Sequence, residues 1–181
     1  DKNDTFLKEA AEYGSGIRIL NQELWEMIIS YIISQNNNIP RIKKGIEAVC
    51  DRYKAVICKD EQDNLEKTEN EIYGFPHFTD IEKNGGRQSL SELGLGYRDE
   101  YIWLMCEYEH ENKVFFENLR KCDYEQSMKM LMEHKGIGRK VANCISLFGL
   151  HHLDACPIDV WMKKIIDEEY GGIQPKWMSD R

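Results

Sequence analysis

The stretch HKGIGRKVANC (residues 134–144) decides the fold of this 181-residue chain. One helix-like run ends at His134 and another begins near Arg139. Gly136 and Gly138 lie between them, so the pattern predicts a tight hairpin between two helices. Amide N–H groups left uncovered at the start of the second helix would form an anion site suited to a phosphate. The hairpin therefore suggests a contact with the backbone of a nucleic acid.

Helical spacing of apolar residues also dominates the rest of the chain, which predicts an all-α fold. Residues 21–33 are apolar over a broad face, as in a buried helix, and an asparagine followed by Pro40 predicts the cap of the next one. Residues 59–71 are charged and indicate a loop or a loose helix end, and 73–76 indicate a turn. Further helices are expected at 88–93, 101–109, 115–119, 124–134 and 160–170.

Composition places the chain among globular proteins, with 41% hydrophobic and 31% charged residues. It has no apolar run long enough to cross a membrane and no visible signal peptide. Its six cysteines are scattered without a CxxC pair, so we expect no zinc site, no disulfide framework and an intracellular location. The net charge of −8 argues against nucleic acid as a partner, but acidic residues gather at 59–71 and 107–111, away from the hairpin.

Three residues after the hairpin glycines carry possible chemistry. Lys140 and Cys144 are four apart and share a helix face, and Asp159 precedes the helix expected at 160–170. A lysine is usually a solvated surface charge, a lone cysteine a small core residue, and such an aspartate a helix cap. Beside a phosphate site, however, a lysine that loses its proton is a nucleophile, and an ionised carboxylate stabilises positive charge developing on a sugar.

A second group of side chains could contact bases. Asn36, Asn37 and Asn38 form a polar run, and Tyr97 and Arg98 follow a glycine-rich joint. Individually they read as a loop with a cap, a packed aromatic and a surface charge. Together they could fill a gap in a base stack and hydrogen-bond an unpaired base.

Five ordered segments resemble the helix-hairpin-helix DNA glycosylases, and among them the 8-oxoguanine DNA glycosylases. The segments are SQNNNIPRI at 34–42, YGFP at 73–76, LGLGYR at 93–98, KGIGRKVANC at 135–144 and CPIDVWM at 156–162. The resemblance implies an all-α core of two helical subdomains with a cleft between them, approximately 21–122, and 1–20 with 123–181. It also implies a β-containing N-terminal domain and a further C-terminal helix, neither of which lies within residues 1–181.

The resemblance also implies roles for the reacting residues. Lys140 would be the nucleophile that forms a Schiff base with the sugar, and Asp159 the acidic residue of the motif. Cys144 would pack on the extruded base, with Phe148 in the same pocket, where a methionine is common. The expected activity is excision of 8-oxoguanine opposite cytosine, followed by β-elimination at the abasic site.

DNA contacts follow from the same resemblance. Asn36 would fill the space left by the flipped nucleotide, Tyr97 would wedge beside the opposite cytosine, and Arg41 and Arg98 would hydrogen-bond that cytosine. Gly136, Ile137 and Gly138 would hold a phosphate, with a possible monovalent or divalent cation on their backbone and no side-chain metal ligand. The implied partner is double-stranded DNA containing oxidised guanine, bound by a monomer in the cytoplasm or nucleoid of a bacterium, or in a eukaryotic nucleus.

Two departures and two rivals qualify these expectations. Lys135 replaces the usual proline before the hairpin glycine, and Trp161 replaces a histidine of vertebrate-like members. One rival is a glycosylase with another base preference, such as an endonuclease III-like enzyme, but the cysteine spacing of an iron–sulfur cluster is missing. The other is a non-catalytic DNA-binding module, which would need neither Lys140 nor Asp159. Burial of Lys140 near Arg139 or Arg98 is expected, because a nucleophilic amine must be neutral.

Overall fold

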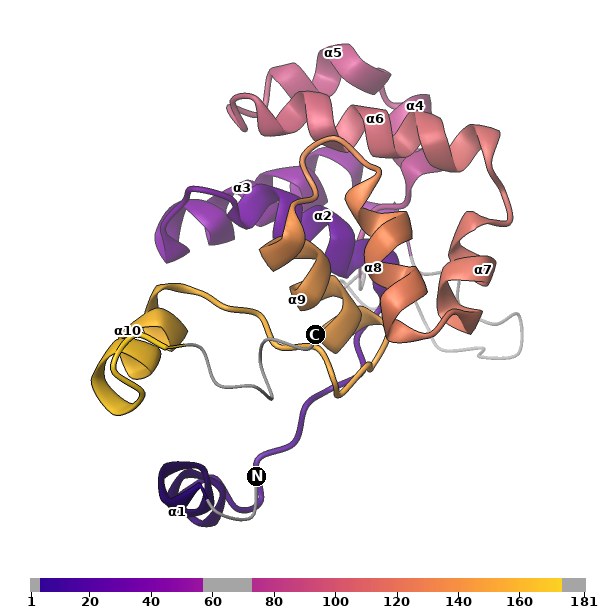
Figure 1. Cartoon of the computed structure of the whole chain (residues 1–181). Coiled ribbons are helices and arrows are strands. Elements are labelled where there is room, and N and C mark those ends of the chain that lie inside the picture. Colours follow the sequence, from indigo (N-terminus) through magenta and orange to yellow (C-terminus); the bar gives the residue numbers. More distant parts are fainter. Residues whose placement is uncertain (1–3, 57–72, 174–181) are drawn as a thin grey trace, which may run out of the picture.

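A computed structural model of the chain describes residues 4–56 and 73–173, and these form a mainly helical protein (Figure 1). The helices are α1 (Thr5–Tyr13), α2 (Leu24–Ser34), α3 (Ile39–Tyr53), α4 (Phe78–Lys83), α5 (Gly86–Ser91), α6 (Arg98–Glu111), α7 (Phe115–Lys121), α8 (Tyr124–Met132), α9 (Arg139–Gly149) and α10 (Val160–Glu169). The predicted helical fold is confirmed. The acidic stretch at 59–71 lies outside the described residues.

The described residues contain one short pair of strands, β1 (Ala55–Val56) and β2 (Tyr73–Gly74). The pair is antiparallel, with Ala55 opposite Gly74 and Val56 opposite Tyr73. The prediction of a turn at 73–76 was therefore wrong for its first half, because Tyr73 and Gly74 pair with a segment that comes before residues 59–71. The first of these strands follows the end of α3, and a pair this short leaves the fold class mainly helical.

Helix α2 is the centre of the core and contacts α3, α6 and α9. Its apolar residues occupy most of its circumference, so it is buried on more than one side. Leu24, Ile28, Ile29, Ile32 and Ile33 are at most 1% exposed. Trp25 is also buried, and its indole N–H donates to the carbonyl of Pro76 at 2.9 Å, which satisfies its one polar group.

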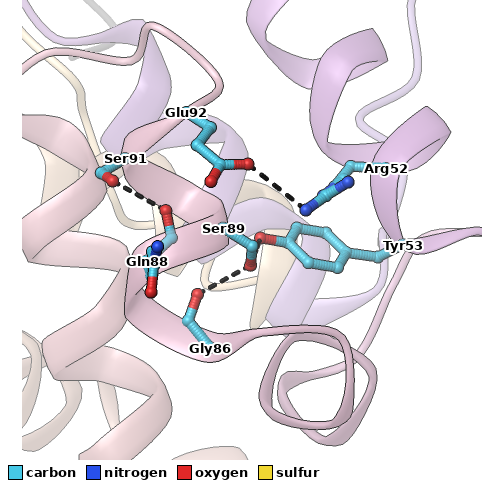
Figure 2. Close-up of polar contacts among 7 residues, drawn as sticks. All are labelled: Arg52, Tyr53, Gly86, Gln88, Ser89, Ser91 and Glu92. Carbon is cyan, nitrogen blue, oxygen red and sulfur yellow. Dashed lines mark hydrogen bonds and ion pairs between the residues drawn. The ribbon is translucent and has the colours of Figure 1, made fainter.

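A small polar cluster joins α3 to α5 (Figure 2). The hydroxyls of Tyr53 and Ser89 are 2.6 Å apart, and Ser89 donates to the carbonyl of Gly86 at 2.8 Å. Beside them Arg52 and Glu92 form an ion pair at 3.4 Å. The buried tyrosine hydroxyl thus has a partner, and neither Tyr53 nor Ser89 lines any of the three hollows described below.

Several helix starts follow the predicted caps. Asn38 caps α3 by accepting from the amide of Arg41 at 3.0 Å, and Pro40 lies in the first turn. Helix α1, which the sequence analysis did not predict, is capped by Asp4 and has no buried residue. It is held to the end of α10, where Tyr170 donates to Asp4 at 2.8 Å and packs against Phe6 (Figure 1).

Candidate functional site

The predicted hairpin lies between α8 and α9 and brings Gly136 into the left-handed region, with φ of +90°. Gly138 caps α9 in an extended conformation. The side chain of Ile137 is 3% exposed, and its amide donates to the carbonyl of His134 at 3.0 Å. Ile137 therefore anchors the hairpin in the core, and its amide is already used inside the protein.

One groove of about 460 Å³ contains both predicted catalytic residues. Lys140 lines it from the first turn of α9, and Asp159 lines it from the start of α10. The remaining lining comes from the end of α2 and the following loop, and from neighbours of the two residues: Ser34, Gln35, Asn36, Asn37, Val141, Ile158, Val160 and Lys163. Three segments distant in sequence thus meet at one open site.

Lys140 and Cys144 contact each other, as their spacing predicts. Cys144 is 4% exposed, and burial raises the pKa of its thiol. The charge of Lys140 and hydrogen bonds from Lys140 and Tyr31 oppose that rise in pKa. The Tyr31 ring also stacks on Phe148, with centroids 6.1 Å apart and planes 23° apart. The two predicted base-pocket residues therefore both lie beside one tyrosine.

Asp159 is a helix cap as well as a groove residue. Its Oδ1 accepts from the amides of Trp161 at 3.0 Å and Met162 at 2.9 Å. The free N–H groups of the first helical turn favour a negative charge at this position. Asp159 is therefore a helix cap, as the sequence indicated. It also lines the groove that contains Lys140, and its catalytic role stays a prediction.

Arg98 holds the loop that carries Asn36. It is 8% exposed, and its guanidinium donates to the carbonyls of Gln35, Leu95 and Asn36, at 2.9 Å from Nε, 3.1 Å from Nη1 and 3.2 Å from Nη2. A second bond from Nη2 also reaches the Gln35 carbonyl. The prediction that Arg98 hydrogen-bonds a base stays untested, but in this structure it fastens two loops together.

Asn36 and Tyr97 form a pair at the surface. Asn36 has φ of +45°, and its side-chain amide donates to the Tyr97 hydroxyl at 3.2 Å. A second hollow, of about 490 Å³, runs from this pair to the hairpin and is lined by Gln35, Asn36, Tyr97, Tyr101, Gly136, Ile137 and Gly138. Arg41 and Arg98 line a third, smaller hollow of about 280 Å³. The predicted DNA-binding residues are thus contiguous.

The structure corrects one expectation and adds two residues. Lys140 is exposed, not buried near Arg139 or Arg98, because α9 directs its second residue into an open groove. Tyr31 was overlooked because an aromatic at helical spacing reads as core. Gln35 was overlooked too: it lines both larger grooves, and its buried amide nitrogen has no hydrogen-bond partner among the described residues.

Metal-binding side chains do not gather in the described part of the chain. Residues 4–56 and 73–173 hold no group of three or more His, Cys, Asp or Glu that could bind a metal ion. Every helix in those ranges is also too short or too polar to cross a membrane.

Comparison with known proteins confirms the resemblance drawn from the motifs, although no protein-family profile matches the chain. The chain is 33% identical over 167 residues to the N-glycosylase/DNA lyase of Saccharomyces cerevisiae, covering 86% of this chain and 42% of that protein. It is 29% identical to N-glycosylase/DNA lyase OGG1 of Arabidopsis thaliana, covering 88% of this chain and 43% of the relative. The chain therefore spans less than half the length of these relatives.

Solved structures agree with the curated relatives. The 8-oxoguanine glycosylase/lyase of Clostridium acetobutylicum is 28% identical; its apo form has a TM-score of 0.80 over 99% of this chain and 60% of its own. Its complex with double-stranded DNA containing cytosine opposite 8-oxoG has a TM-score of 0.78 over 97% of this chain and 57% of its own. A 3-methyladenine DNA glycosylase of Archaeoglobus fulgidus, at 22% identity and a TM-score of 0.71, shares the fold.

Proposed function

We propose, from the premise that this chain is homologous to N-glycosylase/DNA lyases and has the fold of 8-oxoguanine glycosylases, that it acts in base-excision DNA repair. It would remove 8-oxoguanine opposite cytosine and then cleave the abasic strand. The observation that carries the proposal is the single groove containing Lys140 and Asp159, with Cys144 beside the lysine one helical turn along α9. Such a protein acts where genomic DNA is kept, in a bacterial nucleoid or a eukaryotic nucleus.

The proposed reaction uses Lys140 as the nucleophile. Its neutral nitrogen bonds to C1′ of the deoxyribose while the bond from C1′ to the base breaks, and the base leaves with the bonding electrons and takes up a proton. Opening of the sugar ring gives an iminium between Lys140 and C1′. Loss of a C2′ proton then expels the 3′ phosphate by β-elimination, and water releases the lysine.

Asp159 stabilises the positive charge that develops on the sugar as the base departs. Its two bonds from helix amides keep the carboxylate at the groove edge without using Oδ2. Removal of Asp159 would therefore affect both the helix start and the transition state. Cys144 and Phe148 flank the extruded base in this proposal.

Exposure of Lys140 has a role in the proposed mechanism. An open groove lets the nucleotide enter, and the duplex itself then excludes water from the amine. Desolvation disfavours the charged form of a lysine, so binding of DNA would supply the burial that the free chain lacks. The nucleophile is thus activated only on its substrate.

Recognition of the duplex is assigned to the two hollows beside the active groove. Asn36 and Tyr97 enter the base stack, and Arg41 and Arg98 bond the estranged cytosine. The backbone of Gly136–Gly138 holds a phosphate, directly or through a cation on its carbonyls. Extrusion of a base costs a few kcal/mol, which the inserted side chains offset in part.

Borohydride trapping on a duplex with 8-oxoguanine opposite cytosine tests the proposal. Wild-type protein should become covalently attached to DNA, and Lys140→Gln should abolish the adduct. Lys163→Gln is the matched control, since Lys163 lines the same groove and should keep the adduct. An adduct that persists in Lys140→Gln would exclude Lys140 as the nucleophile. Base release without an adduct would exclude a Schiff base, and neither product would favour a non-catalytic DNA-binding module.

A further inference from the structure

Tyr31 lies beside three of the side chains placed around the proposed reaction, Lys140, Cys144 and Phe148. It lies on α2, half-buried, three residues before the helix ends. The Nζ of Lys140 lies 5.8 Å from the centroid of its ring, within the range of a cation–π contact. The same ring stacks on Phe148, with the two centroids 6.1 Å apart. The ring is therefore fixed by one aromatic and placed beside the amine.

The hydroxyl of Tyr31 adds a second link. It interacts with the thiol of Cys144, which also interacts with the amine of Lys140. Burial, followed by the neighbouring Cys144, raises the pKa of the Tyr31 hydroxyl, so the phenol keeps its proton and acts as a donor. Lys140, Cys144 and Tyr31 thus form one cluster, of which Lys140 lines the groove.

We propose that Tyr31 is a positioning residue for the excision reaction: it holds Lys140 through its ring and Cys144 through its hydroxyl, so that the lysine nitrogen is directed into the groove. The proposal rests on the function proposed above. It adds no bond-making step, because Tyr31 acts through its two neighbours and not on the sugar.

A flexible nucleophile needs such support. Lysine carries its charge on a four-carbon stem with several rotatable bonds, and only a small part of its conformers points toward any one atom. Restricting that motion before the substrate arrives raises the fraction of encounters with productive geometry. The attraction to the ring also weakens when the ammonium loses its proton, which frees the neutral nitrogen for attack.

Two substitutions separate the ring from the hydroxyl. Tyr31→Phe keeps the stack on Phe148 and loses only the bond to Cys144, whereas Tyr31→Leu loses both. Single-turnover excision of 8-oxoguanine opposite cytosine should slow roughly 3-fold in Tyr31→Phe and roughly 10- to 30-fold in Tyr31→Leu. Affinity for the same duplex should stay within about 2-fold, because Tyr31 orients the nucleophile and does not grip the DNA backbone.

Tyr53→Phe is the matched control. It also removes one phenol hydroxyl from a buried hydrogen bond, here with Ser89, but Tyr53 lies outside the groove. Thermal unfolding of all three variants shows how much of any loss in excision rate comes from a loss of stability. Excision by Tyr53→Phe should match the wild type, even where its unfolding temperature falls as far as that of Tyr31→Phe.

A further measurement keeps this proposal separate from the function on which it rests. The ionisation of the Cys144 thiol, followed over pH by NMR of the isotopically labelled cysteine Cβ, needs no DNA and reports on a buried group. It should shift to higher pH in Tyr31→Phe, because a hydrogen bond that lowers the thiol pKa is lost. An unshifted profile, or unchanged excision in both Tyr31 variants, overturns the positioning role. A shifted profile in a protein that traps no DNA supports the contact and refutes the enzymatic proposal instead.

Discussion

The ring of Tyr101 lies directly against Gly136, so that an alanine Cβ at position 136 would stand 2.3 Å from Cδ2 of the tyrosine. The same position has φ of +90°, where side chains are strained. Tyr101 on α6 therefore fixes the hairpin in place, and the hairpin has room for glycine alone at this point.

Gly136→Ala should destabilise the protein by about 2–4 kcal/mol, from backbone strain and from the forced shift of Tyr101. Gly138→Ala is the matched control, since its φ is −84° and no heavy atom lies within 4 Å of the added Cβ. Gly138→Ala should lower the stability by only about 0.5 kcal/mol. Urea unfolding measures both, and equal losses would contradict the tight contact at 136.

Asp159→Asn should separate the two roles of this residue. Asparagine is as good a helix cap, so the stability should fall by less than about 0.5 kcal/mol, whereas excision should fall by roughly 10²-fold with the loss of charge. Asp159→Ala should lose the cap too, at about 1 kcal/mol. Asp123→Ala is the comparison: it removes the cap of α8, bonded to Gln126 at 2.9 Å, and should leave excision intact. Full activity in Asp159→Asn would assign Asp159 to capping alone.

Glu109→Gln should change how stability depends on pH. Burial raises the pKa of Glu109 from 4.5 to about 7, opposed by Arg120, and its Oε2 has no hydrogen-bond partner among the described residues. Because the folded-state pKa is the higher one, stability is fully present below about pH 4.5 and is lost as the pH rises through about 7.

The glutamine removes that loss. At about pH 8 Glu109→Gln should be more stable than the wild type by about 1–3 kcal/mol, and at about pH 4 the two should be equal. Urea unfolding at both pH values measures the difference. Glu117→Gln, at a side chain that is 70% exposed, should show no pH-dependent gain. A wild-type protein that is the more stable at high pH would refute the buried, protonated carboxyl.

Arg98→Lys should destabilise the protein by about 2–4 kcal/mol, although it keeps the charge. A single ammonium cannot serve the carbonyls of Gln35, Asn36 and Leu95 together, and any carbonyl left unpaired is costly. Arg41→Lys, at an exposed position, should cost less than about 0.5 kcal/mol. Denaturant unfolding compares the two, and similar small losses would mean that Arg98 does not fasten the loop.

Local features of this fold could be read from the sequence. The hairpin glycines, the Asn38 cap and the Asp159 cap depend on residues a few positions apart, and all three helix starts are where the pattern predicted them. Lys140 and Cys144 contact each other for the same reason, because four residues make about one helical turn.

Features set by distant segments could not be read in this way. Arg98 looked like a surface charge, but it is buried because carbonyls of the loop after α2 turn toward it. Lys140 looked as if it should be buried, but its exposure depends on the groove formed with α10. Tyr31 was not singled out in the sequence, because only the approach of α9 to α2 gives its hydroxyl the Cys144 thiol as a partner.

The bond between Asn36 and Tyr97 joins two surface side chains before any duplex is present. The conformational entropy of ordering them is thus lost once, during folding, and not again at every encounter with a stretch of DNA. Under the proposed function, such a preassembled pair suits a protein that must test many intact base pairs for each damaged one. It also couples the two side chains, while Tyr97 has independent contacts with Tyr101 and Arg98 that remain when Asn36 is replaced.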